Sequence, residues 1–263
     1  MSNGEKEVTK KQWDRRAFLS FGVFSLFGLG IYGIRQWIVN SPDADGAHGP
    51  LRGMLNFNGG VWRGIKSDKH LAAEYPKSMA ALTVRANGYI GLKEVQNTDE
   101  WRLNVLPHGN AETARQITLD EIRSLPKTEI IFDFKCIEGW SQISHWGGVR
   151  VKDLAEHFNL GTRNGSAPSN ERPDDLFNYM ALSTPDGKYY VGIDTQSALH
   201  PQTILAYEMN GAPLPAGHGA PLRLIIPTKY GVKNLKRIGT MAFTDERPPD
   251  YWAERGYDYD SGL

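Results

Sequence analysis

Apolar and polar positions alternate over much of the chain, and this alternation predicts many short strands. Residues 130–134 read as a strand with two large apolar faces, and residues 101–106 alternate as a half-buried strand. Residues 82–92 are interpreted as two strands around an Asn-Gly turn, since Asn-Gly is a strong hairpin signal. Further strands are expected at residues 179–183, 189–193 and 223–226.

Helical patterns are fewer and shorter. Residues 118–125 begin with Thr118 and Glu121, which have the spacing of a capping box, and residues 151–158 predict a second helix. A helical turn starts at residues 197–199 and is expected to continue over residues 203–207. Together with 28 glycines and 15 prolines, this pattern predicts a loop-rich, β-dominated α+β fold in a single domain.

The first forty residues have a separate character. Arg15 and Arg16 stand directly before residues 17–34, which are apolar and carry no charge. The pattern resembles a twin-arginine export signal with an intact Arg-Arg-x-Phe-Leu core. The apolar run is about 18 residues long, near the lower limit for crossing a bilayer, and no clear cleavage site follows. An uncleaved membrane anchor over residues 17–39 is therefore an equal alternative to a cleaved signal.

The basic residues before this run orient the chain. Because positive charge stays on the cytoplasmic side, the body is expected to be exported to the periplasm. We divide the chain into a signal or anchor at residues 1–40, a Gly- and Pro-containing linker at 41–55, and one oxidoreductase domain at 56–263. That body is long enough for a large core.

Charge excludes one class of partner. The whole chain has 30 basic and 30 acidic residues, and the excess of basic residues in the leader leaves the body slightly acidic. Nothing in that balance indicates nucleic-acid binding.

Cys136 is the only cysteine, and it ends the apolar run at residues 130–134. Gly139 follows at once and allows a tight bend, so the backbone can approach a bulky group. The thiol is a metal ligand, a nucleophile or a buried small side chain, and its position alone does not separate these. An unprotected surface thiol is a liability in an oxidising compartment, which favours a buried or metal-bound sulfur.

Four more segments follow in order: Asn-Gly at 210–211, Gly-Ala-Pro-Leu-Arg at 219–223, Lys-Tyr-Gly-Val-Lys-Asn-Leu-Lys at 229–236 and Arg-Pro-Pro at 247–249. With Cys-Ile-Glu-Gly-Trp at 136–140, this series resembles the molybdopterin-binding domain of the sulfite oxidase family over roughly residues 80–255. Within that family it is most similar to the exported, stand-alone branch of periplasmic protein-methionine-sulfoxide reductase catalytic subunits.

The resemblance implies a molybdenum cofactor with one pterin per metal. The metal is then held by two dithiolene sulfurs and one protein thiolate, and Cys136 matches the thiolate position, as ligand and catalytic residue. Soft sulfur donors suit such an ion, and a metal-bound thiol is deprotonated without a neighbouring base.

The resemblance also implies the cofactor contacts. The matching positions are Asn58, Thr184, His218, Arg223, Asn234, Leu235 and Lys236. Arg223 can bind phosphate or pterin oxygens with two parallel hydrogen bonds, and Lys236 adds a point charge. As an alternative to a cofactor contact, Asn58 belongs to a loop formed around the Gly-Gly pair. Thr184 is equally well explained as a turn residue before Pro185. Apart from the motif, the lysines of 229–236 read as a solvated basic face.

The implied activity is oxygen-atom transfer, with reduction of an S-oxide such as protein methionine sulfoxide as the first reading. Oxidation of sulfite is an alternative, and so is a metal-free, membrane-tethered binding module. A sulfite site needs several cations, and the segment after Cys136 offers only His145 and Arg150, which favours reduction. The substrate pocket is expected near Trp140, His145, Trp146 and Tyr257.

A redox partner is implied as well. The chain has no Cys-x-x-Cys-His haem site, so electrons are expected to come from a haem-bearing membrane subunit or a soluble cytochrome. We expect a monomer or a transient heterodimer.

Overall fold

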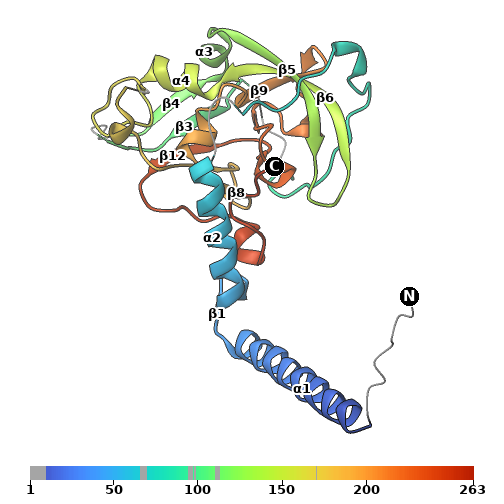
Figure 1. The fold of residues 1–263 in the computed structure, drawn as a ribbon. Coiled ribbons are helices and arrows are strands. Elements are labelled where there is room, and N and C mark those ends of the chain that lie inside the picture. Colours follow the sequence, from blue (N-terminus) through green and yellow to red (C-terminus); the bar gives the residue numbers. More distant parts are fainter. Residues whose placement is uncertain (1–9, 66–69, 94–96, 98, 110–112, 170) are drawn as a thin grey trace.

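The computed structural model describes residues 10–65, 70–93, 97, 99–109, 113–169 and 171–263. Figure 1 shows a body built on two sheets, from which the N-terminal helices α1 (Lys10–Asn40) and α2 (Gly49–Ile65) extend as a stalk. Strands β1 (Asp43–Ala44) and β2 (Ala47–His48) pair as a small ribbon between the two helices. The described part of the chain is thus a mixed, sheet-rich domain with a helical N-terminal extension.

The first sheet carries the hairpin that bears Cys136. Its strands lie in the order β10–β9–β6–β5, and β11 also pairs with β9. All these pairs are antiparallel, and Lys135 lies opposite Ser141, so residues 136–140 form the connecting loop. The strands are β5 (Lys127–Lys135), β6 (Ser141–Arg150), β9 (Ile204–Met209), β10 (Ala212–Pro213) and β11 (Arg223–Ile225).

The second sheet lies in the order β4–β3–β12–β7–β8. Only the β12–β3 pair is parallel; the others are antiparallel. The strands are β3 (Arg102–Val105), β4 (Arg115–Thr118), β7 (Tyr179–Ser183), β8 (Tyr190–Asp194) and β12 (Thr240–Thr244). The strand predictions at 101–106, 130–134, 179–183, 189–193 and 223–226 are therefore confirmed.

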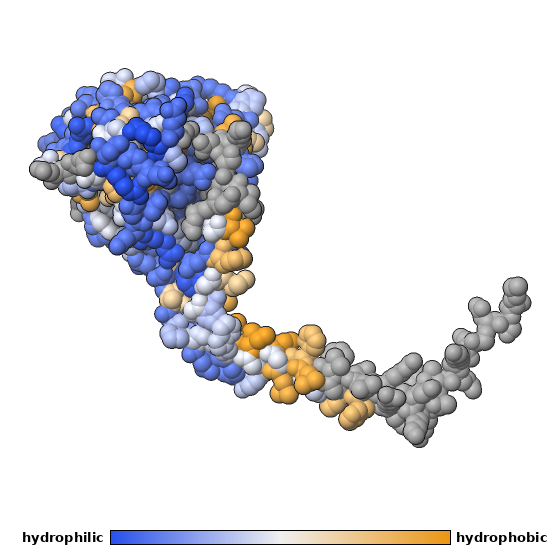
Figure 2. All heavy atoms as spheres, turned by 60° about the vertical axis from the view of Figure 1, so that its left-hand side comes forward, coloured by the Kyte–Doolittle hydropathy of each residue, from blue (hydrophilic) through white to orange (hydrophobic). Residues whose placement is uncertain are grey.

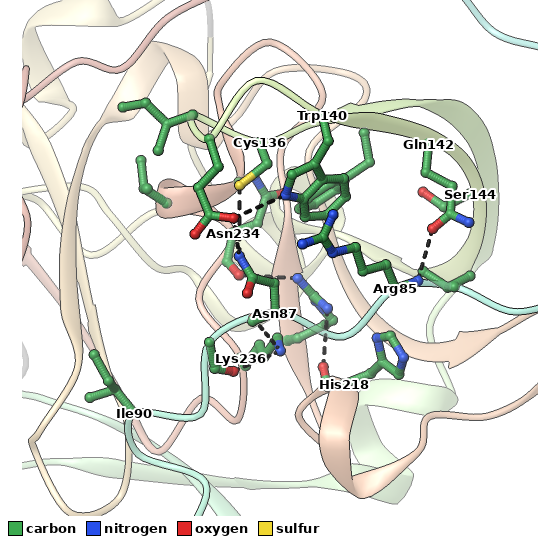
Figure 3. A pocket seen from close by; sticks show the side chains of 18 of the residues that line it. Arg85, Asn87, Ile90, Cys136, Trp140, Gln142, Ser144, His218, Asn234 and Lys236 are labelled. Carbon is green, nitrogen blue, oxygen red and sulfur yellow. Dashed lines mark hydrogen bonds between the residues drawn. The ribbon is translucent and has the colours of Figure 1, made fainter.

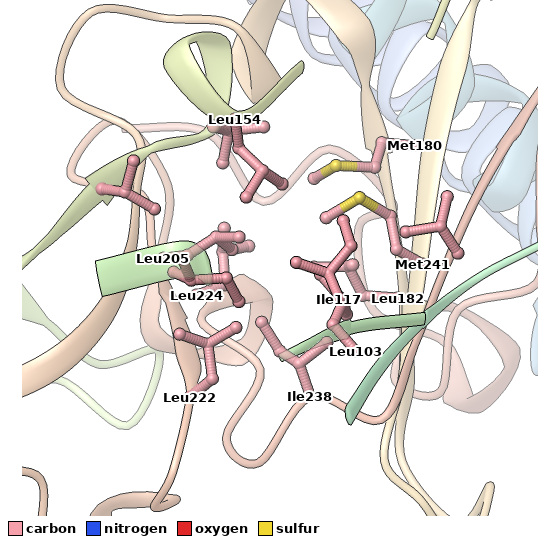
Figure 4. Close-up of a cluster of buried hydrophobic side chains, with 14 of the residues drawn as sticks. Leu103, Ile117, Leu154, Met180, Leu182, Leu205, Leu222, Leu224, Ile238 and Met241 are labelled. Atoms are coloured by element: carbon pink, nitrogen blue, oxygen red, sulfur yellow. The ribbon is translucent and has the colours of Figure 1, made fainter. Parts of the chain in front are cut away.

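The main apolar core joins the two sheets (Figure 4). Leu103, Met180 and Met241 from the second sheet share it with Leu205 and Leu224 from the first, and all five are fully buried. A smaller cluster on the first sheet includes Ile130, Phe132 and Trp146. Apolar burial of this extent fixes the first sheet against the second, and so fixes the frame on which the site is built.

Short helices close the body. They are α3 (Leu119–Arg123), α4 (Val151–Phe158), α5 (Thr195–Ala198) and the 3₁₀ turns η1 (Lys77–Met79), η2 (Pro173–Asp175), η3 (Ala216–His218), η4 (Gly231–Lys233) and η5 (Ala253–Arg255). The expected capping box is present. Thr118 accepts from the amide of Glu121, and the carboxylate of Glu121 accepts from the amide of Thr118. The predicted helices at 118–125 and 151–158 are confirmed.

Two secondary-structure predictions are wrong. Residues 204–207 lie in β9 instead of a helix. Both faces of β9 are buried there, and a short apolar run has the same pattern in a buried helix and in a buried strand. Residues 82–92 form no strands. Side chains hold this segment in place of a strand ladder: Arg85 donates its amide to Gln142, and Gln142 donates to the carbonyl of Thr83.

The segment expected to be a linker, residues 41–55, contains the start of α2, which runs across residues 49–65. Pro50 in its first turn, taken as a linker signal, fits a helix start, where no amide partner is needed. Arg52 is buried and donates to the carbonyls of Tyr257 and Ala253, which fastens α2 to the C-terminal segment.

The helix expected over residues 17–39 lies within α1. Figure 2 shows apolar residues gathered along the stalk, and exposed large side chains there include Phe27, Trp37, Met54 and Phe57. Of the helices within the described ranges, none combines the length and the apolar character that crossing a membrane requires.

Candidate active site

An open cavity of about 200 Å³ lies beside the β5–β6 hairpin (Figure 3). It is lined by the segment at 84–90, the hairpin loop, one face of β6, the region from His218 to Lys236 and the segment at 252–257, together with Phe134 of β5 and Tyr189. Gln142, Ser144 and Trp146 line it from β6, as alternate residues on one face of a strand do. The walls are largely aromatic, with cationic and amide groups set among them.

Cys136 projects into this cavity from the hairpin loop. The backbone amide of Cys136 donates to the carbonyl of Trp140 (2.9 Å), and the backbone amide of Gly139 donates to the carbonyl of Cys136 (3.0 Å). Gly139 has φ +86°, a left-handed conformation that glycine adopts without strain, as the sequence indicated. The thiol is only partly buried and lines the cavity, so the reading of Cys136 as a packed core side chain is wrong.

Asn87 and Glu138 form a polar cluster around the sulfur. The Asn87 amide nitrogen lies 3.9 Å from the Cys136 sulfur and 3.0 Å from the Glu138 carboxylate. The indole of Trp140 donates to the same carboxylate at 3.1 Å. The hydrogen bond from Asn87 has the larger effect and that from Trp140 the next. Together they hold the pKa of Glu138 below its usual range, so the carboxylate is ionised at neutral pH.

Arg223 is a buried cation that pairs with no carboxylate of the residues the structure describes. Its guanidinium donates to the carbonyls of His218 (3.1 Å) and Asn234 (3.2 Å), while Nε has no hydrogen-bond partner among the described residues. It lies 4.5 Å from the centre of the Trp146 ring. Burial lowers the pKa of Arg223 to about 9, which still leaves it charged at neutral pH. A buried charge left in this state calls for an anion from outside the chain.

Lys236 is the second cation of the cavity. Its ammonium donates to the carbonyls of Asn87 (2.7 Å), Gly88 (3.0 Å) and Gly217 (3.1 Å), and it pairs with no carboxylate in the described part of the chain. Burial, and to a lesser degree Arg223, lowers the pKa of Lys236 to about 7. Burial likewise lowers the pKa of His218 to about 4, so His218 is a neutral hydrogen-bonding group here.

Lys229 and Lys233, from the same basic segment, do not face the cavity. Lys229 is buried and pairs with Asp194 at 3.1 Å, and Lys233 is buried and pairs with Asp250. The reading of this segment as a solvated basic face is therefore wrong for both. Two of its cations are neutralised inside the fold, and Lys236 is left free of carboxylates.

The structure brings together most of the predicted site residues. Cys136, His218, Arg223, Asn234 and Lys236 all line the cavity, and so do Trp140, Trp146 and Tyr257 from the expected substrate pocket. The side-chain amide of Asn234 also bonds to the backbone of Tyr230 and Ile226, which fixes the loop on which Lys236 stands.

Four expected residues lie elsewhere. Asn58 is exposed on α2 and does not line the cavity, and its Gly-Gly neighbourhood lies in a helix packed on the body. Thr184 is buried in a turn, where its hydroxyl bonds to Asp186 (2.7 Å). Leu235 is a core residue. His145 points to the other face of β6 and lies 3.5 Å from Glu129, because neighbouring strand residues alternate.

Asn87, Arg85 and Glu138 are site residues that the sequence reading missed. The Asn-Gly pair at 87–88 was assigned to a hairpin turn. Glu138 lies in the sequence between Cys136 and the Gly-Trp pair, and this place inside the Cys136 motif indicates a site residue.

The donor set fits a sulfur-bearing, phosphate-bearing cofactor. Within the described ranges, no group of three or more His, Cys, Asp or Glu side chains is placed to hold a metal ion. A metal beside Cys136 therefore needs further ligands from an organic group, and the cavity provides the space. Arg223 and Lys236 supply the charge that a terminal phosphate requires.

The family comparison agrees with a molybdopterin cofactor. Residues 90–252 match the family model described as the oxidoreductase molybdopterin binding domain. A putative protein-methionine-sulfoxide reductase subunit YedZ1 from Azospira oryzae is 33% identical over 220 residues, covering 84% of this chain and 79% of that protein. The protein-methionine-sulfoxide reductase catalytic subunit MsrP of Campylobacter jejuni is 29% identical, covering 71% of this chain but only 63% of that protein. Among solved structures, the sulfane dehydrogenase SoxCD of Paracoccus pantotrophus aligns with a TM-score of 0.48 at 16% identity, covering 59% of this chain and 40% of that one.

Proposed function

Since the chain belongs to the oxidoreductase molybdopterin-binding domain family, we propose that it reduces S-oxides, with oxidised methionine in proteins as the first candidate. The relatives from Azospira and Campylobacter carry protein-methionine-sulfoxide reductase in their names. The observation that carries the proposal is the pair Arg223 and Lys236, two cations without carboxylate partners, in the same cavity as the single thiol.

The reaction is R₂S=O + 2 H⁺ + 2 e⁻ → R₂S + H₂O, and the S–O bond is the one broken. The bound molybdenum cofactor supplies the two-electron centre and the acceptor for the oxygen atom. The chain supplies the Cys136 thiolate as metal ligand, Arg223 and Lys236 as anchors for the phosphate, and the aromatic walls that shape the substrate space. The hydrogen bonds from Asn87 and Trp140 keep Glu138 ionised, so Glu138 holds no proton to donate to the substrate.

Sulfite oxidation is the second candidate, and Arg85 is the observation that favours it. In the sequence, His145 and Arg150 are the cations that follow Cys136, and two cations are few for a sulfite site. Neither of these two lines the cavity, whereas Arg85 does. An additional cation beside the thiol suits an anionic substrate.

Export and the redox partner are further parts of the proposal. The paired arginines before residue 17 and the apolar stretch after them support the twin-arginine route, with the body in the periplasm and α1 as a leader or an anchor. A haem-bearing membrane subunit or a soluble cytochrome then delivers the electrons.

The first experiment is elemental analysis of the protein purified from a host that makes molybdopterin. We expect about one molybdenum per chain in the wild type and loss of bound metal in Cys136→Ser. An unaltered far-ultraviolet circular dichroism spectrum of the variant shows that the fold persists. If the wild type is well folded but contains no molybdenum, the enzyme hypothesis fails and the metal-free binding module is the function that remains.

The second experiment separates the two reactions. The loaded enzyme is assayed with reduced viologen dye and methionine sulfoxide, and separately with ferricyanide and sulfite. We expect turnover in the first assay and little in the second. Turnover only with sulfite makes the enzyme an oxidase and overturns the proposal.

A further inference from the structure

Arg85 occupies a fixed position at the mouth of the cavity. Its backbone amide donates to the side chain of Gln142 at 2.8 Å, and Gln142 in turn donates to the carbonyl of Thr83 at 3.0 Å. Its guanidinium lies 4.6 Å from the centre of the Trp140 ring. Figure 3 shows this guanidinium beside Trp140, on the side of the cavity where the hairpin loop presents Cys136.

The donors of this guanidinium are unused. Across the described ranges, no carboxylate lies within ion-pair distance of it and no residue accepts a hydrogen bond from its side chain. Glu138 is the acidic group that feels its charge, and the carboxylate of Glu138 already accepts from Asn87 and Trp140. A planar guanidinium held over an aromatic ring keeps its outer edge free for two parallel hydrogen bonds to an oxyanion.

The three cations of the cavity have different surroundings. Arg223 is completely buried against Trp146, and Lys236 is tied to three backbone carbonyls. These two face the interior, where the cofactor is expected. Arg85 is exposed at the opening, and it touches the same loop that carries the thiol. A molecule that enters from solvent therefore meets Arg85 before it reaches the sulfur.

We propose that Arg85 is a specificity residue that binds a carboxylate of the substrate while the S-oxide group of that substrate reaches the metal beside Cys136. The inference rests on the proposed function and narrows its substrate class to S-oxides that carry a carboxylate within a few bonds. Free or C-terminal methionine sulfoxide, and methionine sulfoxide next to an acidic residue, belong to this class. Neutral S-oxides are poor substrates.

The kinetic test compares two substrates that differ by one charge. These are N-acetyl-methionine sulfoxide, which has a free carboxylate, and its methyl ester. For the wild type we expect kcat/KM for the acid to exceed that for the ester about tenfold, mainly through KM, which corresponds to about 1.4 kcal/mol. High salt should reduce the ratio, because the pair is exposed.

The variants identify the group responsible. Arg85→Gln should bring the ratio near one, mainly by raising KM for the acid, and Arg85→Lys should keep part of the preference. Arg255→Gln is the control: it removes the same charge and a ring contact (3.6 Å to the Tyr251 ring centre), together with a hydrogen bond to the Tyr251 carbonyl, but Arg255 does not line the cavity. Its ratio should match that of the wild type.

A binding measurement keeps this test independent of the reaction. N-acetyl-methionine sulfone and its methyl ester resemble the substrates but lack the reducible group. Calorimetric titration of the molybdenum-loaded protein should show tighter binding of the acid, and Arg85→Gln should remove the difference. If the wild type reduces no S-oxide at all, the proposed function fails, and this titration alone decides the role of Arg85.

Two results overturn the inference. One is an acid-to-ester ratio near one in the wild type, or a preference that survives Arg85→Gln. The other is loss of molybdenum from Arg85→Gln, which assigns the guanidinium to the cofactor.

Discussion

The low pKa of Lys236 predicts that a rise in pH stabilises the empty protein and has less effect on the stability of the loaded one. Burial and the neighbouring Arg223 lower this pKa to about 7 in the fold, whereas the unfolded chain keeps the ordinary value of 10.5. Between these two values the unfolded chain binds more protons than the folded one. The free energy of unfolding of the cofactor-free protein therefore rises as the pH rises above 7.

The size of this change in the free energy of unfolding follows from the titration of one proton. A full difference of one bound proton changes stability by about 1.4 kcal/mol per pH unit, which gives an upper value of about 2 kcal/mol between pH 7 and pH 9. Lys236 is partly exposed, so solvent screening reduces this to about 1 kcal/mol. In the loaded protein a phosphate keeps Lys236 protonated, so the gain disappears and the cofactor is held less tightly as the pH rises.

The assay is urea unfolding of the cofactor-free protein at pH 7, 8 and 9. Lys236→Met should remove the part of the pH slope that Lys236 contributes, while Lys152→Met, a change at a partly exposed lysine on α4, should keep it. The loaded protein should show a smaller slope than the empty one. Equal slopes in the wild type and in Lys236→Met would refute the argument, because they place the titrating group elsewhere.

Three further predictions concern the frame of the site, and each is checked by the same urea unfolding. Asp250→Asn leaves the buried ammonium of Lys233 without its charge partner and should destabilise the protein by about 3–5 kcal/mol, so Asp250→Glu serves as the comparison that keeps the charge. Gly139→Ala has open space for its Cβ, so only the left-handed backbone opposes it; we expect a loss of about 1–2 kcal/mol and, in the loaded protein, weaker metal retention. Thr118→Ala removes the capping box shared with Glu121 and should cost about 1 kcal/mol without any change in molybdenum content.

The hydrophobic pattern was sufficient for the strands of both sheets, but not for the segment beside the cavity. Strands such as β5 and β7 carry their own signal, because their alternation follows from one buried face. The segment at 82–92 has a similar composition but is held by the side chains of Gln142 and Lys236, which lie far away in the sequence. No local rule can show such an anchor.

The residues of the site, too, could be predicted only in part from the sequence. Cys136, Arg223 and Lys236 were found because motif order marked them, and the cavity does unite them. His145 was misplaced because its side of β6 depends on the register of the hairpin, which sequence alone does not give. Asn87 was missed because Asn-Gly is a strong turn signal, and that signal concealed a side chain that contacts the sulfur.

The pairing of charges explains why one basic segment serves two purposes. Lys229 and Lys233 meet Asp194 and Asp250, which are brought from β8 and the C-terminal region, so they fix the loop within the fold. Lys236 has no such carboxylate, and the fold therefore carries an uncompensated charge until an anion binds. Binding of the cofactor must then stabilise the folded chain by mass action. If export follows the proposed twin-arginine route, which carries folded proteins, this coupling makes the loaded chain the form that is best folded for transport.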